Sequence, residues 1–141
     1  MFSAEEAREA ILSMDFTRPP HVDPKVWPSR VGIMSVANEV IRFAAMSPAG
    51  TAFPAVEHIA KRINYNRRST QRCLRILEHK GAWDRHPEGP AGRAAARHQV
   101  ETEYGVAYPQ ERPGRRSATY VLRVGRVPVN GEGRAQARRR A

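Results

Sequence analysis

The middle of the chain carries a row of basic side chains at helical spacing. At about 100° per residue, one side of a helix would present four of them, namely Arg68, Arg72, Arg75 and His79. The opposite side would present an apolar stripe at i, i+3, i+4 and i+7, made of Thr70, Cys73, Leu74 and Leu77. From His58 to Leu77 there are six Lys or Arg residues and no acid, whereas a merely solvated helix usually includes compensating glutamates. The pattern therefore predicts a helix that packs with one face and binds a polyanion with the other.

The other reactive side chains form no catalytic or metal-binding pattern. Cys73 is the only cysteine, and its place in the apolar stripe predicts a buried structural thiol. His58, His79, His86 and His98 have no spacing that would make a metal site with this cysteine. Carboxylates are scattered, and no glycine-rich phosphate loop or nucleophile motif is present. We expect no enzyme activity, no metal, no cofactor and no small-molecule ligand.

The overall charge points to nucleic acid as the partner. The 141 residues include 24 Lys and Arg against 14 Asp and Glu, a net charge of +10. A charge of this sign and size attracts polyanions through long-range fields and counterion release. A single cysteine suits a reducing cytosol, and charges interrupt every long apolar stretch. The sequence thus predicts a cytoplasmic protein that is neither secreted nor membrane-spanning.

Two segments precede the predicted core. Ser3 and Glu6 have the spacing of a capping box, and apolar residues at helical intervals follow as far as Met14, so we expect a short N-terminal helix. Prolines at 19, 20, 24 and 28 then predict an extended arm, with Trp27 packed on the domain. Residues 1–30 are accordingly an N-terminal helix and a Pro-rich arm.

Three core helices are expected next. Apolar residues recur at helical spacing from Val31 to Met46, with Val36, Val40, Phe43 and Ala44 inward. Residues 47–51 read as a loop, and Pro54 begins a short second helix that continues to Ile63. Asn64 and Asn66 suit a turn and a helix cap, and a third helix follows to Lys80, where Gly81 ends it.

Two strands and two irregular segments complete the prediction. Residues 82–85 and 119–124 are rich in β-forming side chains and are expected to pair as a hairpin. About thirty residues separate them (about 86–117), longer than a compact loop, so part of this insertion should be mobile or hold a small extra element. Residues 125–141 end in three consecutive arginines and predict a disordered basic tail. The predicted domain spans 31–124.

The segment from Phe53 to Trp83 resembles the winged helix-turn-helix domains of bacterial and phage regulators and replication initiators. The resemblance covers roughly residues 31–124. It implies a mainly helical α+β fold with three core helices, a β-hairpin wing, an extra N-terminal helix and a basic tail. In that family the third core helix enters the major groove of DNA.

The resemblance also implies which side chains face DNA. On the third helix they are Asn66, Arg67, Arg68, Ser69, Gln71 and Arg72, with Arg75 nearer the DNA backbone. Arg115 and Arg116 occupy the usual place of basic residues in the wing. Arg can pair with guanine and Gln with adenine through two hydrogen bonds each.

We therefore expect a sequence-specific binder of double-stranded DNA that acts by occupying its site. It would be a transcriptional regulator or a plasmid or phage replication or recombination factor, associated with the nucleoid of a bacterial or phage-infected cell. Two alternatives stay open at this point: a protein-interaction module built on the same fold, and a binder of structured RNA. Formation of a homodimer is also left open.

Overall fold

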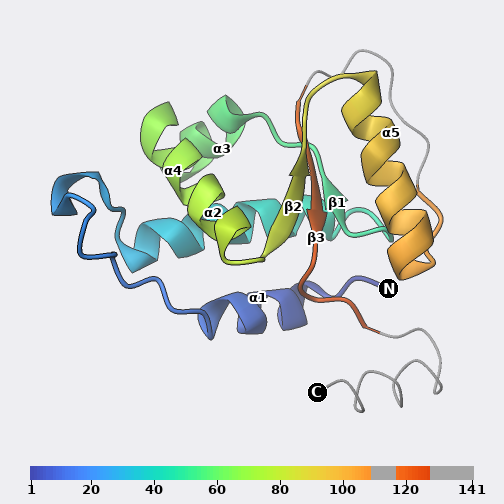
Figure 1. Cartoon of the computed structure of the whole chain (residues 1–141), viewed down its shortest axis with the longest axis horizontal. Coiled ribbons are helices and arrows are strands. Elements are labelled where there is room, and N and C mark those ends of the chain that lie inside the picture. The colour runs from blue at the N-terminus through green and yellow to red at the C-terminus, as the bar shows by residue number, and fades with distance from the viewer. Residues whose placement is uncertain (109–116, 128–141) are drawn as a thin grey trace.

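The computed structural model describes residues 1–108 and 117–127. Within them a three-stranded antiparallel sheet separates three helices from a fourth (Figure 1). On one side lie α2 (Arg30–Ala44), α3 (Val56–Ile63) and α4 (Arg67–His79), and on the other lies α5 (Pro90–Gln99). The fold is mainly helical α+β, as predicted.

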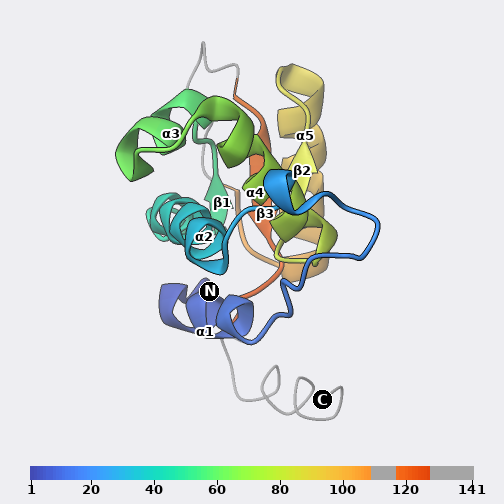
Figure 2. The same ribbon diagram turned by 90° about the vertical axis from the view of Figure 1, so that its left-hand side faces the viewer.

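The N-terminal helix α1 (Ala4–Leu12) forms at its predicted capping box. The Ser3 hydroxyl accepts a hydrogen bond from the Glu6 backbone N–H at 3.3 Å. Ala7 and Ile11 are fully buried in the main core, and α1 packs against α2 (Figure 2). The helix is thus part of the single main core rather than a detached extension.

The proline-rich arm folds on itself as well as on the core. The Trp27 indole N–H donates to the Phe16 carbonyl at 3.0 Å, and Phe16 is buried in the main core. A short 3-10 helix, η1 (Pro24–Val26), was not predicted; it begins where Asp23 caps the Lys25 backbone N–H. The prolines therefore hold a compact loop between α1 and α2.

Helix α2 supplies the centre of the main core. Val36, Val40 and Ala44 are buried as predicted, and Ile33 and Ile41 join them. Phe43 lies only partly inside, with its ring 5.6 Å from that of His58 on α3. The helix begins at Arg30 because Ser29 caps it, and it ends at Ala44, two residues before the predicted end.

The two predicted strands are neighbours, and a third strand was missed. β2 (Trp83–His86) pairs antiparallel with β3 (Thr119–Leu122), as expected. β1 (Thr51–Ala52) pairs with the other edge of β3, where the sequence analysis expected only the end of a loop. A two-residue strand is too short to show the alternation from which strands are predicted.

Strand β3 is central, and both of its faces are buried. Tyr120 and Leu122 belong to the main core beneath the helices. Val121 packs on the opposite face in a second small core with Ala96 and Val100 of the α5 side. Burial on both faces explains why this strand reads as an almost continuous β-forming run.

The long insertion between β2 and β3 holds helix α5 and a π-helical turn, η2 (Val100–Tyr104). The sequence predicted that part of this insertion would be mobile or would hold a small extra element. Over the described residues up to 108, the structure shows the extra element. The first turn of α5 lies close against the preceding loop: a Cβ atom on Gly92 would be only 1.8 Å from the Pro87 carbonyl oxygen. Only glycine therefore fits at this position. Up to residue 108, the connection between the strands is therefore helical rather than a tight turn.

Residues 125–127, which the sequence analysis placed in the tail, belong to the fold. The Ser3 backbone N–H donates to the Gly125 carbonyl at 2.7 Å, and Phe2 and Arg126 form an isolated antiparallel bridge. The rest of the predicted tail, 128–141, lies outside the described residues. None of the helices in the described ranges is both long enough and apolar enough to cross a bilayer.

Candidate nucleic-acid interface

The turn between α3 and α4 sets the direction in which α4 points. Asn64 ends α3 in left-handed geometry, with φ of 58°, a conformation that asparagine tolerates better than most residues. Asn66 then caps α4, because its side-chain oxygen accepts a hydrogen bond from the Ser69 backbone N–H at 2.8 Å. Both asparagines thus do what the sequence predicted of them.

Helix α4 has the two faces that its sequence predicted. Thr70, Cys73, Leu74 and Leu77 are all buried against the core. On the opposite face Arg68, Arg75 and His79 are exposed, while Arg72 is partly covered. The helical phase inferred from the sequence is therefore right, and the arginines do not contribute to the core.

Tertiary contacts supply acids that the local sequence lacks. The Glu39 carboxylate on α2 lies 3.0 Å from Nε of Arg62, and the Glu57 carboxylate at the start of α3 lies 2.6 Å from Nη1 of Arg67. The run of bases without acids between 58 and 77 is thus partly compensated in space. Exposed pairs of this kind contribute about 0–1 kcal/mol to stability.

Three arginines of α4 keep their charge uncompensated. Among the described residues, no carboxylate forms an ion pair with Arg68, Arg72 or Arg75. These side chains recur every three or four residues and so follow one line along the helix. The line is the strongest cationic feature of α4 and faces away from the core.

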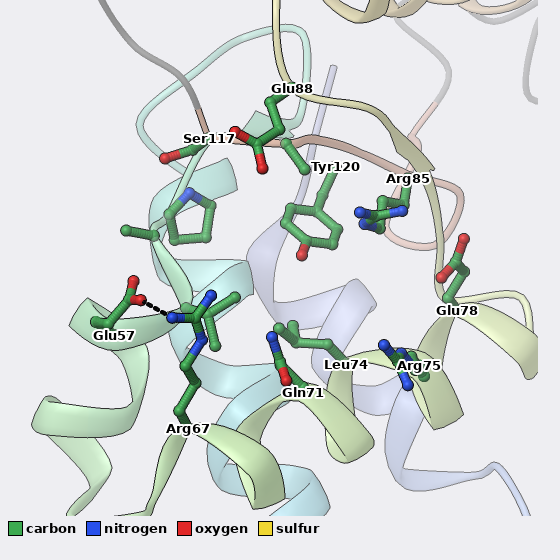
Figure 3. A pocket seen from close by; sticks show the side chains of 14 residues that line it. Glu57, Arg67, Gln71, Leu74, Arg75, Glu78, Arg85, Glu88, Ser117 and Tyr120 are labelled. Carbon is green, nitrogen blue, oxygen red and sulfur yellow. Dashed lines mark ion pairs between the residues drawn. The ribbon is translucent and has the colours of Figure 1, made fainter.

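A groove of about 460 Å³ runs beside this line, between α4, the first turn of α3 and the strands β2 and β3 (Figure 3). Leu74, Val56 and Pro54 give it apolar walls, and its charged side chains are Arg67, Arg75, Arg85, Glu57, Glu78 and Glu88. Three guanidinium groups against three carboxylates leave the groove close to neutral. The groove is therefore less cationic than the exposed line of α4, although the two share Arg75.

The structure separates the residues that the sequence analysis grouped as one DNA-binding set. Arg67, Gln71 and Arg75 line the groove, whereas Arg68 and Arg72 do not. Asn66 and Ser69 bond to each other at the start of α4, so the Asn66 side-chain oxygen is already occupied as a cap. Arg115 and Arg116 lie outside the described residues.

Sequence reasoning missed Glu57, Arg85 and Tyr120, which the fold brings to the same groove. Each comes from a different element, and none has a spacing to α4 that a local pattern could reveal. Burial raises the pKa of the Tyr120 hydroxyl, and the nearby Arg85 guanidinium partly opposes this rise. The hydroxyl is therefore neutral at physiological pH and can both donate and accept a hydrogen bond.

Cys73 is a buried thiol rather than a reactive one. It has no exposed surface, and burial raises its pKa to about 11. At neutral pH it is fully protonated, so it is neither a nucleophile nor a metal ligand of the thiolate kind. In the described ranges, no three His, Cys, Asp or Glu side chains gather in a way that could hold a metal ion.

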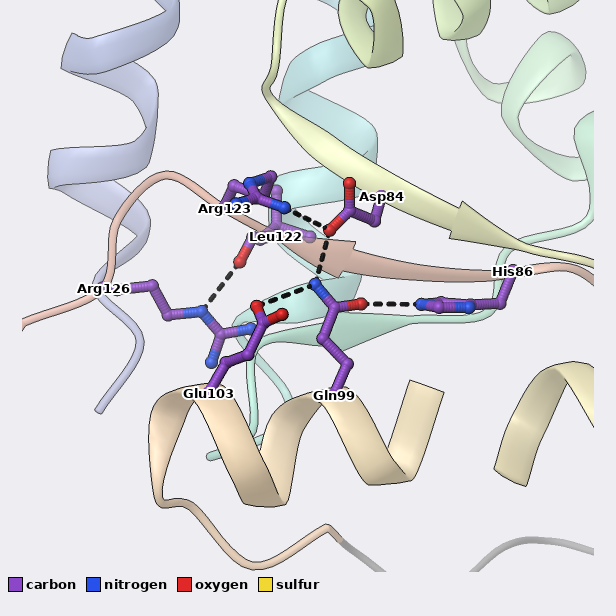
Figure 4. Close-up of polar contacts among 7 residues, drawn as sticks. All are labelled: Asp84, His86, Gln99, Glu103, Leu122, Arg123 and Arg126. Atoms are coloured by element: carbon purple, nitrogen blue, oxygen red, sulfur yellow. Dashed lines mark hydrogen bonds and ion pairs between the residues drawn. The ribbon is translucent and has the colours of Figure 1, made fainter. Parts of the chain in front are cut away.

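A second polar cluster joins α5 to the sheet (Figure 4). The Gln99 amide links three side chains: its oxygen lies 2.7 Å from Nε2 of His86, and its nitrogen donates to the carboxylates of Asp84 and Glu103. Arg123 completes it with an ion pair to Asp84 at 2.7 Å. These side chains satisfy one another, which marks the cluster as a structural link between the insertion and the sheet.

The chain was compared with models of known protein families, with curated proteins and with solved structures, and none of them matches it.

Proposed function

We propose that this protein is a winged helix-turn-helix protein that binds double-stranded DNA sequence-specifically and acts by occupying its site. The observation that carries the proposal is the uncompensated line of Arg68, Arg72 and Arg75 on the exposed face of α4. A helix with a diameter of about 10–12 Å fits the major groove of B-DNA, which is about 12 Å wide. Arginines in such a line can reach phosphates and guanine edges at the same time.

The order of the elements supports the winged-helix part of the proposal. From α2 to β3 the chain forms a helix, a short strand, two helices joined by a tight turn and two further strands, with α5 and η2 inserted between these last two strands. The sheet order β1-β3-β2 places the last strand in the middle. In this arrangement α2, α3 and β2 pack against one face of α4 and leave its opposite face exposed.

The insertion changes what a wing can do in this protein. A simple hairpin wing is a flexible ribbon, but here α5 packs back on the sheet through Ala96, Val100 and Val121. We therefore assign most of the DNA contact to α4 and its groove, and a bracing role to α5. As a DNA-binding protein of this kind, it would act in the nucleoid of a bacterial or phage-infected cell.

Selection of bound duplexes from a random DNA library tests the proposal directly. The expected result is a consensus site, whose symmetry reports how many copies of the protein bind. Affinity for that site should fall with salt, with a log–log slope of about −0.9 per phosphate contact. Enrichment of no sequence, together with a flat salt response, would overturn the proposal.

The same measurements separate the two other classes of partner. A structured-RNA binder would prefer folded RNA to the selected duplex and lose little when the duplex sequence is scrambled. A protein-interaction module would bind its partner with little dependence on salt. Either outcome would contradict site-specific DNA binding.

A further inference from the structure

We infer that Glu57 is a specificity-determining residue, which holds the Arg67 guanidinium in the groove so that it reads a guanine edge rather than a phosphate. This inference rests on the proposed DNA-binding function, and it distinguishes the arginine that reads a base from those that contact phosphates. It starts from one contact, the 2.6 Å approach of a Glu57 carboxylate oxygen to Nη1 of Arg67.

The contact leaves the other edge of the guanidinium available. Arg67 has five N–H donors in a planar fork, and its contact with Glu57 is made at Nη1. The edge formed by Nε and Nη2 presents two parallel N–H groups, the arrangement that fits two adjacent acceptors such as guanine O6 and N7. An arginine held by one partner also loses less conformational freedom when it binds a second.

The position of Arg67 suits reading of a base edge. It is the first residue of α4, and N-terminal residues of a helix in the major groove are the ones that meet base edges. Its side chain extends toward the groove that Gln71 and Tyr120 also line, while Glu57 approaches it from the start of α3 (Figure 3). Both partners are 63% exposed, so the pair is accessible to DNA.

The net charge of the Glu57–Arg67 pair explains why Arg67 would bind a base edge in preference to a phosphate. Phosphates are attracted to any cation, whatever the sequence, whereas the Glu57 carboxylate cancels the long-range field of Arg67 and repels a phosphate close to it. In the part of the chain that the structure describes, Arg68, Arg72 and Arg75 have no such partner, so their charge attracts the DNA backbone. Arg67 should therefore contribute little affinity for scrambled DNA but much preference for one base.

The chain offers a matched control in Glu39. This carboxylate also lies against an arginine, with Arg62 Nε at 3.0 Å, but neither residue lines the groove. Glu39→Gln and Glu57→Gln raise the net charge equally; the first releases two arginines, Arg42 and Arg62, and the second releases Arg67. Because E39Q frees at least as much positive charge, a larger effect of E57Q reflects its position in the groove and not the change of charge.

The experiment measures dissociation constants of the full chain for the selected duplex and for a scrambled duplex of equal length, at one salt concentration. For E57Q we expect tighter binding of the scrambled duplex and a fall in the specific-to-scrambled ratio of about 5- to 150-fold, the range that one bidentate Arg–guanine pair provides. For E39Q we expect the two constants to change in parallel. Glu57→Asp should restore part of the ratio.

Arg67→Lys provides an independent readout, because it keeps the charge and removes the fork. A second library selection with R67K should relax the consensus at one guanine position and leave the others unchanged. The inference is overturned if E57Q changes the ratio no more than E39Q does, or if R67K keeps the full consensus. Failure of the parent protein to select any sequence would instead refute the proposed function, and this inference with it.

Discussion

The Tyr65 ring lies directly against the backbone of Gly32, so closely that a Cβ atom on Gly32 would be 2.3 Å from the Tyr65 hydroxyl oxygen. Tyr65 is in the turn between α3 and α4, and Gly32 is in the first turn of α2. The glycine is thus needed for close approach: its missing side chain lets the turn rest on α2.

We predict that Gly32→Ala destabilises the fold by about 1–3 kcal/mol, the usual cost of forcing extra atoms into a packed site. The better helix propensity of alanine, about 1 kcal/mol, offsets part of this cost. Urea denaturation of G32A, Y65A and the double variant measures it. Because Y65A removes the clash, the effects should be non-additive; strictly additive effects would show that the two residues do not meet.

Arg68→Ala and Arg72→Ala should each weaken binding to the selected duplex, by about fivefold or more where a base contact is lost. Their free energies of unfolding should stay within about 0.5 kcal/mol of the parent, since neither side chain contributes to the core. Arg8→Ala, an equal change of charge on α1, is the control and should affect binding less. Unfolding of R68A or R72A would instead assign a structural role to that arginine.

Leu74→Ala and Leu77→Ala should cost about 2–5 kcal/mol each, the range for emptying a buried leucine site. Leu74 is 4% exposed and Leu77 is fully buried. The control is the same substitution at Leu12, which is 48% exposed and should lose much less. Equal losses at all three leucines, measured by urea denaturation, would contradict the burial of this stripe.

Cys73 should make the protein less stable at alkaline pH. Its folded-state pKa is about 11, above the ordinary 9.0, because burial disfavours the thiolate. Above pH 9 the unfolded chain therefore loses the thiol proton first, and the free energy of unfolding falls by up to about 1.4 kcal/mol per pH unit until about pH 11. Below pH 9 this group causes no change.

The measurement compares the parent with Cys73→Ala from pH 8 to pH 11, so that the tyrosines and lysines titrate alike in both proteins. The difference between the two stability curves isolates the thiol. Parallel curves over this range would show that the thiol is not shielded in the folded protein.

The sequence by itself determined the elements whose signals are local. The phase of α4 follows from four inward residues at helical spacing, and its start follows from Asn66, whose side chain caps the helix within three residues. The α1 capping box was predicted for a similar reason, because it links Ser3 and Glu6 within one helical turn. Such signals survive in sequence because hydrogen bonds and periodicity link neighbours along the chain.

Only the tertiary structure decided what surrounds the arginines of α4. Glu57 pairs with Arg67 and Glu39 pairs with Arg62, although each acid lies in a different helix from its arginine. No regular spacing in the sequence predicts these contacts. Likewise β1 has two residues and forms only because β3 offers an unpaired edge beside it. Charge compensation and strand pairing depend on distance in space, and the packing of α2, α3 and the sheet sets that distance. The sequence could therefore predict a basic helix, but only the fold places Arg67 against a carboxylate in the groove and leaves Arg68 and Arg72 outside it, with Arg75 at the border between the two.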